Sequence, residues 1–281
     1  MIVDSHQHFW RPEKGDHPWL TGPLEPIRRP FGPEDLRPAL HECGVDRTVV
    51  VRTWASVGEM RDFLDLAART DFLAGVVGWV DLTAADVTAT IAGLRESEHG
   101  RFLVGLRHQA HDEPDPRWHL RPEVERGIAA IGAAGLVYDL LVRPRELAAA
   151  LELVERHPEV TFVIDHIAKP PIAGGQRAEW ETRLAPFAGH PNVHCKLSGM
   201  VTEAERQSWT PEVLHHYVDA VLSWFGQGRP MFGSDWPVCL VAGSYRQVFD
   251  ALRHCIRDLP AADQDRVLGG NAISVYRLGS G

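Results

Sequence analysis

Eight β-rich runs separated by helical patterns predict one domain of the α/β class, a single (β/α)8 or TIM barrel spanning residues 1–281. The start of each run is nearly continuous in apolar residues, as expected of strands that are covered on both faces. No linker rich in Pro, Gly or Ser and no break in composition divides the chain. A doubly wound sheet is the alternative, but it seldom needs eight such units, and no G-x-G-x-x-G follows the first run.

The predicted strands alternate with helices along the whole chain. They cover residues 2–9, 47–54, 72–82, 103–110, 136–142, 161–168, 192–199 and 230–237. The longest irregular stretch, residues 11–33, is rich in Pro and Gly and would be the loop after the first strand, on the catalytic face.

Three of the intervening helices carry start or stop signals. Gly44 is a good C-terminal stop for the helix that precedes it. Thr83, with Asp86 three residues later, is similar to a capping box and predicts a helix start at Thr83. Thr210 is a candidate cap that places Pro211 at the first helical position.

Composition excludes several classes of protein. The net charge of -9 and the lack of a basic block argue against nucleic-acid binding. No apolar run approaches the length of a membrane span, and the N-terminus has no pattern typical of a secretory signal. The four cysteines are far apart, which is typical of reduced thiols. We therefore expect a cytoplasmic protein with no nucleic-acid or membrane partner.

Polar side chains gather where the predicted strands end. Catalytic groups of a TIM barrel lie at these C-terminal strand ends. The residues found there are His6, His8, Thr53, Asp81, Arg107, His108, Asp139, Asp165, His166, Lys196, Ser198, Ser234 and Asp235.

The first strand carries two histidines one residue apart. Alternate residues of a strand point to the same side, so Asp4, His6 and His8 are expected on one face, toward the barrel interior or its mouth. Two imidazoles there could bind one metal ion; the alternative is a pair of hydrogen-bonded core histidines. With His166 and Asp235 ending two other strands, a functional cluster is favoured. Asp235 is the candidate general base, and a helix N-cap is its alternative role.

The fourth strand ends in two adjacent candidates, Arg107 and His108, which cannot both point inward on a regular strand. The sequence leaves open which of them faces the pocket. A salt bridge behind the barrel is the alternative for Arg107. Asp139, at the end of the fifth strand, could accept sugar hydroxyl groups or hold Arg107 or His108.

Four further residues are candidates for contact with substrate. Lys169 follows the sixth strand and Lys196 lies inside the seventh, where an unpaired lysine would be costly. Membership of structural ion pairs is the alternative for both. Trp10 and Trp236 stand beside the proposed catalytic groups, and their rings could pack on sugar C–H groups or belong to the core.

These residues lie within segments that resemble a known superfamily. D-x-H-x-H on the first strand, a histidine ending the sixth and an aspartate ending the eighth resemble the amidohydrolase superfamily. The segments DSHQHFW, GLRHQAHDEPDP, YDLLVRP, VIDHIAKPPI, NVHCKLSGMVTEA and MFGSDWPV resemble its sugar-lactonase branch, that of L-fuconolactonase and L-rhamnonolactonase. The resemblance covers essentially the whole chain.

The resemblance implies a set of catalytic positions, namely His6, His8, Arg107, His108, His166 and Asp235. Of these, His6, His8, His166 and Asp235 would be the ligands if a metal is bound. The sequence departs from the superfamily's binuclear pattern, because strand four has no lysine to bridge two metals and strand five ends in Asp139 in place of histidine. We therefore expect no required cofactor, or one optional divalent metal such as zinc.

The implied reaction is hydrolysis of a small-molecule sugar lactone, L-fucono-1,5-lactone or a related aldonolactone, by water that Asp235 activates. Two alternatives stay open: a zinc-dependent decarboxylase of the same superfamily, and a non-catalytic sugar-binding barrel. The sequence leaves the oligomeric state and the stereochemistry of the substrate open.

Overall fold

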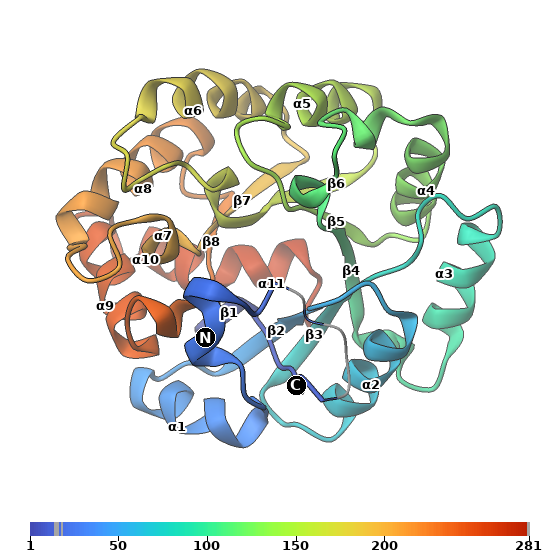
Figure 1. Cartoon of the computed structure of the whole chain (residues 1–281), viewed down its shortest axis with the longest axis horizontal. Coiled ribbons are helices and arrows are strands. Elements are labelled where there is room, and N and C mark those ends of the chain that lie inside the picture. The colour runs from blue at the N-terminus through green and yellow to red at the C-terminus, as the bar shows by residue number, and fades with distance from the viewer. Residues whose placement is uncertain (14–16, 18, 280–281) are drawn as a thin grey trace.

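The computed structural model describes residues 1–13, 17 and 19–279 and confirms the predicted (β/α)8 barrel. Eight parallel strands pair in chain order, and a parallel bridge between Gln7 and Trp236 joins the first strand to the segment that follows the last one. Figure 1 shows the strands at the centre of a ring of helices. The strands are β1 Val3–Gln7, β2 Arg47–Val51, β3 Leu73–Gly78, β4 Leu103–His108, β5 Val137–Leu140, β6 Thr161–Ile164, β7 Val193–Leu197 and β8 Pro230–Phe232.

Eleven α-helices are found within the described ranges, most of them on the outside of the sheet. They are α1 Pro33–Cys43, α2 Val57–Ala68, α3 Val87–Glu96, α4 Pro122–Ala133, α5 Leu147–Arg156, α6 Arg177–Leu184, α7 Met200–Glu203, α8 Pro211–Phe225, α9 Tyr245–Cys255, α10 Ala261–Asp265 and α11 Asn271–Val275. None of the helices in the described part of the chain is long and apolar enough to cross a membrane.

Two of the three helix signals are confirmed. Gly44 ends α1 with φ 65°, a left-handed conformation that glycine adopts without a steric penalty. Pro211 is the first residue of α8, although the Thr210 side chain makes no capping hydrogen bond. The predicted start at Thr83 is wrong, because the Thr83 amide and hydroxyl both donate to the carboxylate of Asp81 in a preceding turn. Helix α3 therefore begins only at Val87.

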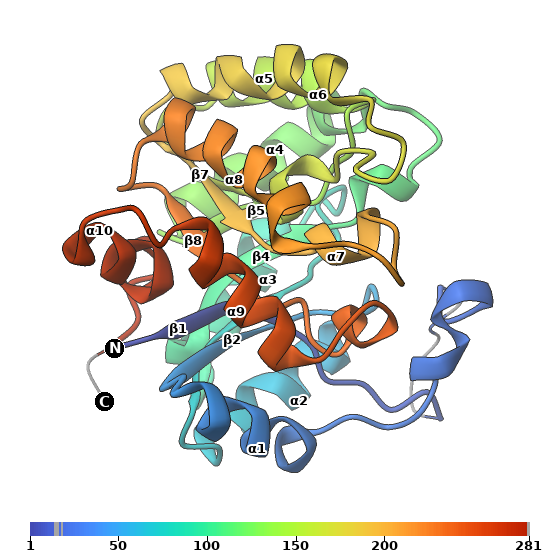
Figure 2. The same ribbon diagram turned by 90° about the vertical axis from the view of Figure 1, so that its left-hand side faces the viewer.

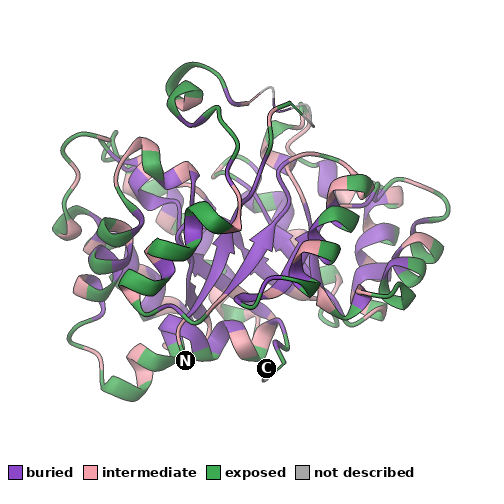
Figure 3. Ribbon diagram, turned by 90° about the horizontal axis from the view of Figure 1, so that it is seen from below, coloured by how far each residue is buried: buried purple, intermediate pink, exposed green. Residues whose placement is uncertain are grey.

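The apolar core has two parts, one between sheet and helices and one inside the barrel. The inner part joins valines of six strands to the C-terminal segment and contains Val3, Val49, Val51, Val77, Val104, Val137, Val163, Met231, Ala272, Tyr276 and Leu278. Figure 3 shows the resulting pattern, with buried strands at the centre and exposed outer helix faces. The C-terminal segment thus closes the barrel at the end where the strands begin.

The loops that follow the strands lie at the opposite end. In Figure 2, β1 starts beside the N-terminus and points toward the blue segment that contains the 3-10 turn Gly22–Ile27. The loop predicted over residues 11–33 therefore lies at the catalytic face, as expected, apart from residues 14–16 and 18, which lie outside the described part.

One predicted shared face is wrong. The side chains of Asp4 and His6 do not share a face, although the His6 amide donates to the Asp4 carboxylate, because the pairing register of β1 with β2 shifts between Asp4 and Gln7. The Asp4 carboxylate accepts hydrogen bonds from the Ser234 amide and from the hydroxyl of Tyr245 on α9, on the outside of the barrel. Val3 and His6 point inward instead.

Candidate active site

Three imidazoles and one carboxylate converge at the C-terminal strand ends. Oδ1 of Asp235 lies 3.3 Å from Nε2 of His8, 3.8 Å from Nε2 of His6 and 3.9 Å from Nε2 of His166. The two Nε2 atoms of His6 and His8 are 3.2 Å apart. All four side chains are buried, with exposed fractions of 0 to 7%. The residues that the sequence places on strands one, six and eight therefore form one compact group.

Two hydrogen bonds orient the rings of this group. The carbonyl oxygen of Val51 lies 2.8 Å from Nδ1 of His8, so that nitrogen carries a proton and Nε2 of a neutral His8 keeps its lone pair. Nδ1 of His166 lies 2.8 Å from Oγ of Ser198, which follows β7. Both contacts leave the Nε2 atoms pointing toward Asp235.

The backbone that presents His166 is left-handed over four successive residues. The φ angles from His166 to Lys169 are 53°, 48°, 60° and 49°. Each costs about 1–2 kcal/mol in an L-residue, and the β-branched Ile167 is an outlier among them. The indole of Trp180 donates a 2.6 Å hydrogen bond to the Ile167 carbonyl and helps to hold the turn. Asp235 is also left-handed, with φ 57°. Strained backbone of this kind persists where the surrounding structure enforces it, often at functional sites.

Glycines make room for two of the histidines. A Cβ on Gly199 would lie 2.6 Å from Nδ1 of His166, and one on Gly233 would lie 2.8 Å from Cβ of His6. Contacts below 3.0 Å do not occur at real Cβ atoms, so neither position accepts a side chain without movement of the histidine beside it.

The structure decides between the two candidates at the end of β4. Arg107 points inward, where its Nη1 lies 3.0 Å from Asp165 and 3.3 Å from Nε2 of His6. His108 points away and contacts Glu113 at 2.8 Å, and its ring stacks on Trp118 with centroids 3.9 Å apart. The structure therefore brings Arg107, but not His108, to the histidine cluster.

A buried ion-pair network lies directly beneath the cluster. Nζ of Lys196 contacts the carboxylates of Asp139 at 2.5 Å and Asp165 at 2.9 Å, and it lies 3.2 Å from Nδ1 of His6. The Tyr276 hydroxyl donates to Asp139 at 2.8 Å. Lys196 and Asp139 are fully buried and form an ion pair with each other. Asp139 therefore pairs with Lys196 and not with Arg107 or His108. The predicted contact of Lys196 and Asp139 with substrate stays a prediction.

The remaining predicted contacts lie at the rim. Lys169 is partly exposed and pairs with Glu203 at 3.3 Å. The indole of Trp10 donates to the carbonyl of Arg29 at 2.9 Å and thus ties the loop after β1 in place. Trp10 and Trp236 both pack edge-on against Phe31 and are 3% exposed. Their role in binding sugar also stays a prediction.

Burial and neighbouring charges set the protonation of the cluster. Burial lowers the pKa of His8 and lowers the pKa values of His6 and His166 far below the usual range, so the rings are neutral near pH 7. Burial alone would raise the pKa of Asp235, but its neighbours, His166 foremost, outweigh burial and lower that pKa below its usual range. The site therefore combines an ionised carboxylate with neutral imidazoles.

This donor set suits one divalent metal ion. His6, His8 and Asp235 each offer one ligand atom within 4.8 Å of the others, and imidazole and carboxylate are ligands that zinc accepts. A second group of His6, Asp165 and His166 meets the same criterion. Asp165 is already engaged by Lys196 and Arg107, so the group with Asp235 is better suited.

The sequence did not single out Asp165, Ser198 and Tyr276 as site residues. Asp165 and Ser198 had a signal, because both are polar and end predicted strands. Tyr276 had none, since it lies far along the chain from every other member of the group and reaches Asp139 only through the closing of the barrel.

Comparisons with known proteins show the family to which the chain belongs. A family described as amidohydrolase matches residues 3–278. An L-fucono-1,5-lactonase of Burkholderia ambifaria is 44% identical over 98% of this chain and 95% of its own, and one of Burkholderia multivorans is 38% identical over 99% and 96%. A crystal structure of an amidohydrolase from Burkholderia multivorans with bound zinc is 36% identical, has a TM-score of 0.94, and is matched over 99% of this chain and all of that one. The chain therefore belongs to the amidohydrolase family.

Proposed function

We propose that the chain is a lactonase that opens a sugar lactone, L-fucono-1,5-lactone or a related aldonolactone, to the sugar acid. The observation that carries the proposal is the ionised Asp235 facing three neutral imidazoles at the strand ends. The full-length similarity to relatives named L-fucono-1,5-lactonase supports the choice of substrate.

The proposed reaction begins with a water molecule at the Asp235 carboxylate. Asp235 accepts a proton as the water oxygen attacks the lactone carbonyl carbon. Nearby polar groups, among them Arg107, stabilise the negative charge that develops on the carbonyl oxygen. The bond from the carbonyl carbon to the ring oxygen then breaks, and the ring oxygen takes the proton back from Asp235. The proposed product is an open-chain acid with one new hydroxyl group.

We propose that the site accepts one divalent ion. His6, His8 and Asp235 would hold it, with His166 beside them. When bound, such an ion supplies a Lewis acid for the lactone carbonyl. The bound zinc of the Burkholderia multivorans structure supports zinc as the ion.

Neither alternative is favoured. Structures of 2,6-dihydroxybenzoate decarboxylase share 14 to 15% identity with this chain and therefore show a shared fold alone. A sugar-binding barrel without activity does not require an ionised carboxylate among imidazoles.

We also propose a cytoplasmic location and a single catalytic domain. The four free cysteines support the location. The continuous eight-stranded barrel supports the single domain.

The proposal is tested with Asp235→Asn in a proton-release assay over a panel of aldonolactones. Asparagine suits this position because it tolerates left-handed backbone, so the loop should keep its shape. We expect loss of activity by about 10²–10⁴-fold, the contribution typical of a general base. Asp250→Asn, on the exposed part of α9, is the matched control. Unchanged turnover in Asp235→Asn would exclude the mechanism, and failure to open any lactone would exclude the function.

A further inference from the structure

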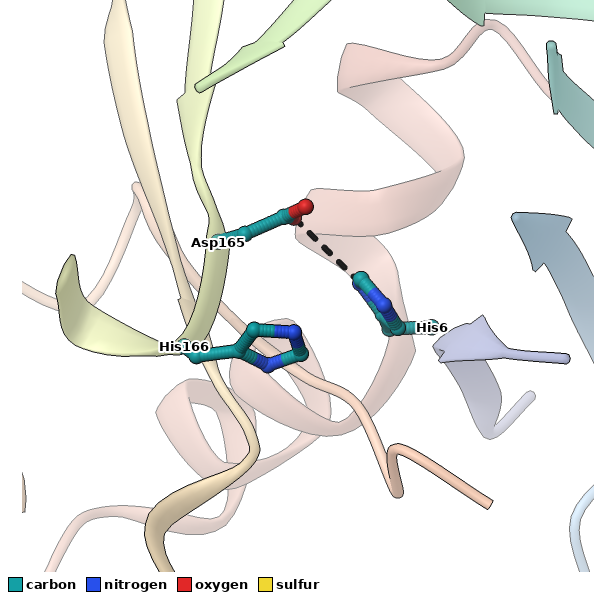
Figure 4. A group of neighbouring side chains, drawn as sticks. All are labelled: His6, Asp165 and His166. Atoms are coloured by element: carbon teal, nitrogen blue, oxygen red, sulfur yellow. Dashed lines mark ion pairs between the residues drawn. The ribbon is translucent and has the colours of Figure 1, made fainter. Parts of the chain in front are cut away.

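Each ring nitrogen of His6 lies near both a hydrogen-bond donor and a hydrogen-bond acceptor. At Nδ1, the carboxylate of Asp165 lies 3.3 Å away and can only accept a proton, whereas Nζ of Lys196 lies 3.2 Å away and can only donate one. Figure 4 shows Asp165 and His166, from the same turn, pointing toward the His6 ring. Nδ1 therefore has a hydrogen-bond partner whether or not it carries the proton.

The other nitrogen, Nε2, faces His8 and Asp235, and Nη1 of Arg107 lies 3.3 Å from it on the side of Asp165. The Val51 carbonyl fixes the proton of neutral His8 on Nδ1, so Nε2 of His8 is an acceptor 3.2 Å from Nε2 of His6. A proton on Nε2 of His6 can be donated to that acceptor. Without it, the His6 lone pair can accept from Arg107, but it still faces the lone pair of His8 and the Asp235 carboxylate, which favours a cation between these groups.

The charged groups around Asp165 allow the ring proton of His6 to lie on either nitrogen. Lys196 also contacts Asp139, and Arg107 donates to Asp165 at 3.0 Å and to the carbonyl of Arg52 at 2.7 Å. Both cations therefore keep acceptors when the His6 proton moves. Neutral His6 holds one ring proton in each arrangement, so no group gains or loses charge.

We propose that Asp165 and Lys196 are positioning residues that let His6 exchange tautomers when a divalent cation binds. Without the cation, Nε2–H donates to His8, and Lys196 donates to Nδ1. With the cation, the proton lies on Nδ1 and is donated to Asp165, and the Nε2 lone pair is free as a ligand. The inference rests on the proposed assignment of His6 to the site and does not depend on lactone chemistry.

The first test needs no variant. Protein labelled with ¹⁵N-histidine is measured after treatment with chelator and again after loading with zinc. Two-bond ¹H–¹⁵N correlations distinguish a protonated ring nitrogen from one with a lone pair, and His6→Asn identifies the His6 signals. We expect Nε2–H in the chelator-treated protein and Nδ1–H in the zinc-loaded protein. The same tautomer in both states would overturn the proposal.

The second test is zinc affinity, measured by competition with a chromophoric chelator. Asp165→Asn removes the carboxylate acceptor at Nδ1, and we expect affinity to fall by about 10–100-fold, as is typical for a partner of a ligating histidine. Asp139→Asn is the matched control, because Asp139 contacts Lys196 as Asp165 does but does not reach His6. Equal affinities of the two variants would count against Asp165.

If Asp165→Asn does not fold, the spectra of the unmodified protein still test whether His6 changes its tautomer when zinc binds. Neither test uses a lactone. A protein that switches tautomer but opens no lactone would therefore remove the proposed function and leave this inference standing.

Discussion

Replacement of Gly199 by alanine should impair the site through a single methyl group. Gly199 precedes α7 with φ 63°, and its missing side chain leaves space for the ring of His166. The new Cβ would lie 2.6 Å from Nδ1, 2.7 Å from Cγ and 2.9 Å from Cβ of His166. The ring must therefore move away from Gly199, and its hydrogen bond to Ser198 must lengthen or break.

The size of the effect follows from these distances. Ordinary contacts of a Cβ begin at 3.4 Å, so the ring has to shift by about 0.8 Å. A misplacement of about 1 Å in a catalytic group can cost about 10²-fold in rate, or about 3 kcal/mol of transition-state stabilisation. Alanine in left-handed backbone costs a further 1–2 kcal/mol or so in free energy of unfolding.

A matched variant separates the two effects. Gly44 has φ 65°, and nothing lies within 4 Å of a Cβ built there, so Gly44→Ala carries the backbone cost without the contact. Both variants should lose free energy of unfolding in urea, and Gly199→Ala at least as much as Gly44→Ala, because it adds the contact with His166. Only Gly199→Ala should lose kcat/KM in the lactone assay. Activity of Gly199→Ala equal to that of Gly44→Ala would refute the role given to the position of His166.

Three further predictions concern pH, metal and loop. Because the pKa of Asp235 is lowered by its neighbours and that of His8 is lowered by burial, the base is ionised and the imidazole neutral at pH 7 and above. The value of kcat/KM should therefore change little between pH 8 and pH 7 and fall only at a pH below 6.5, the ordinary pKa of histidine; a loss centred at or above 6.5 would contradict this. Chelation should leave measurable lactone opening, since Asp235 remains; complete loss with recovery on adding zinc would show that the ion is required. Trp10→Phe removes the indole donor to Arg29 and should lower the free energy of unfolding by about 1–2 kcal/mol in urea; an unchanged midpoint would argue against that anchor.

Much of the fold could be predicted because its signals are local. Apolar runs, helical spacing and stop signals such as Gly44 depend on neighbouring residues, and all eight strands lie within their predicted ranges. The structural strands are shorter, because the polar ends that carry His166 and Asp235 leave the sheet as strained turns. The start of α3 was missed because the Asp81 side chain caps a turn in place of the helix.

The sequence by itself determined that a parallel barrel forms and that His6, His8, His166 and Asp235 end its strands, since parallel strands bring those ends to one face. Only the tertiary structure decided which side chains point into the barrel. Alternation along a strand holds while the backbone is regular, and the register shift in β1 turns Asp4 outward while His6 stays inside. Likewise, the partners of Lys196 come from separate strands, and the buried charges pair only once the barrel has closed around them.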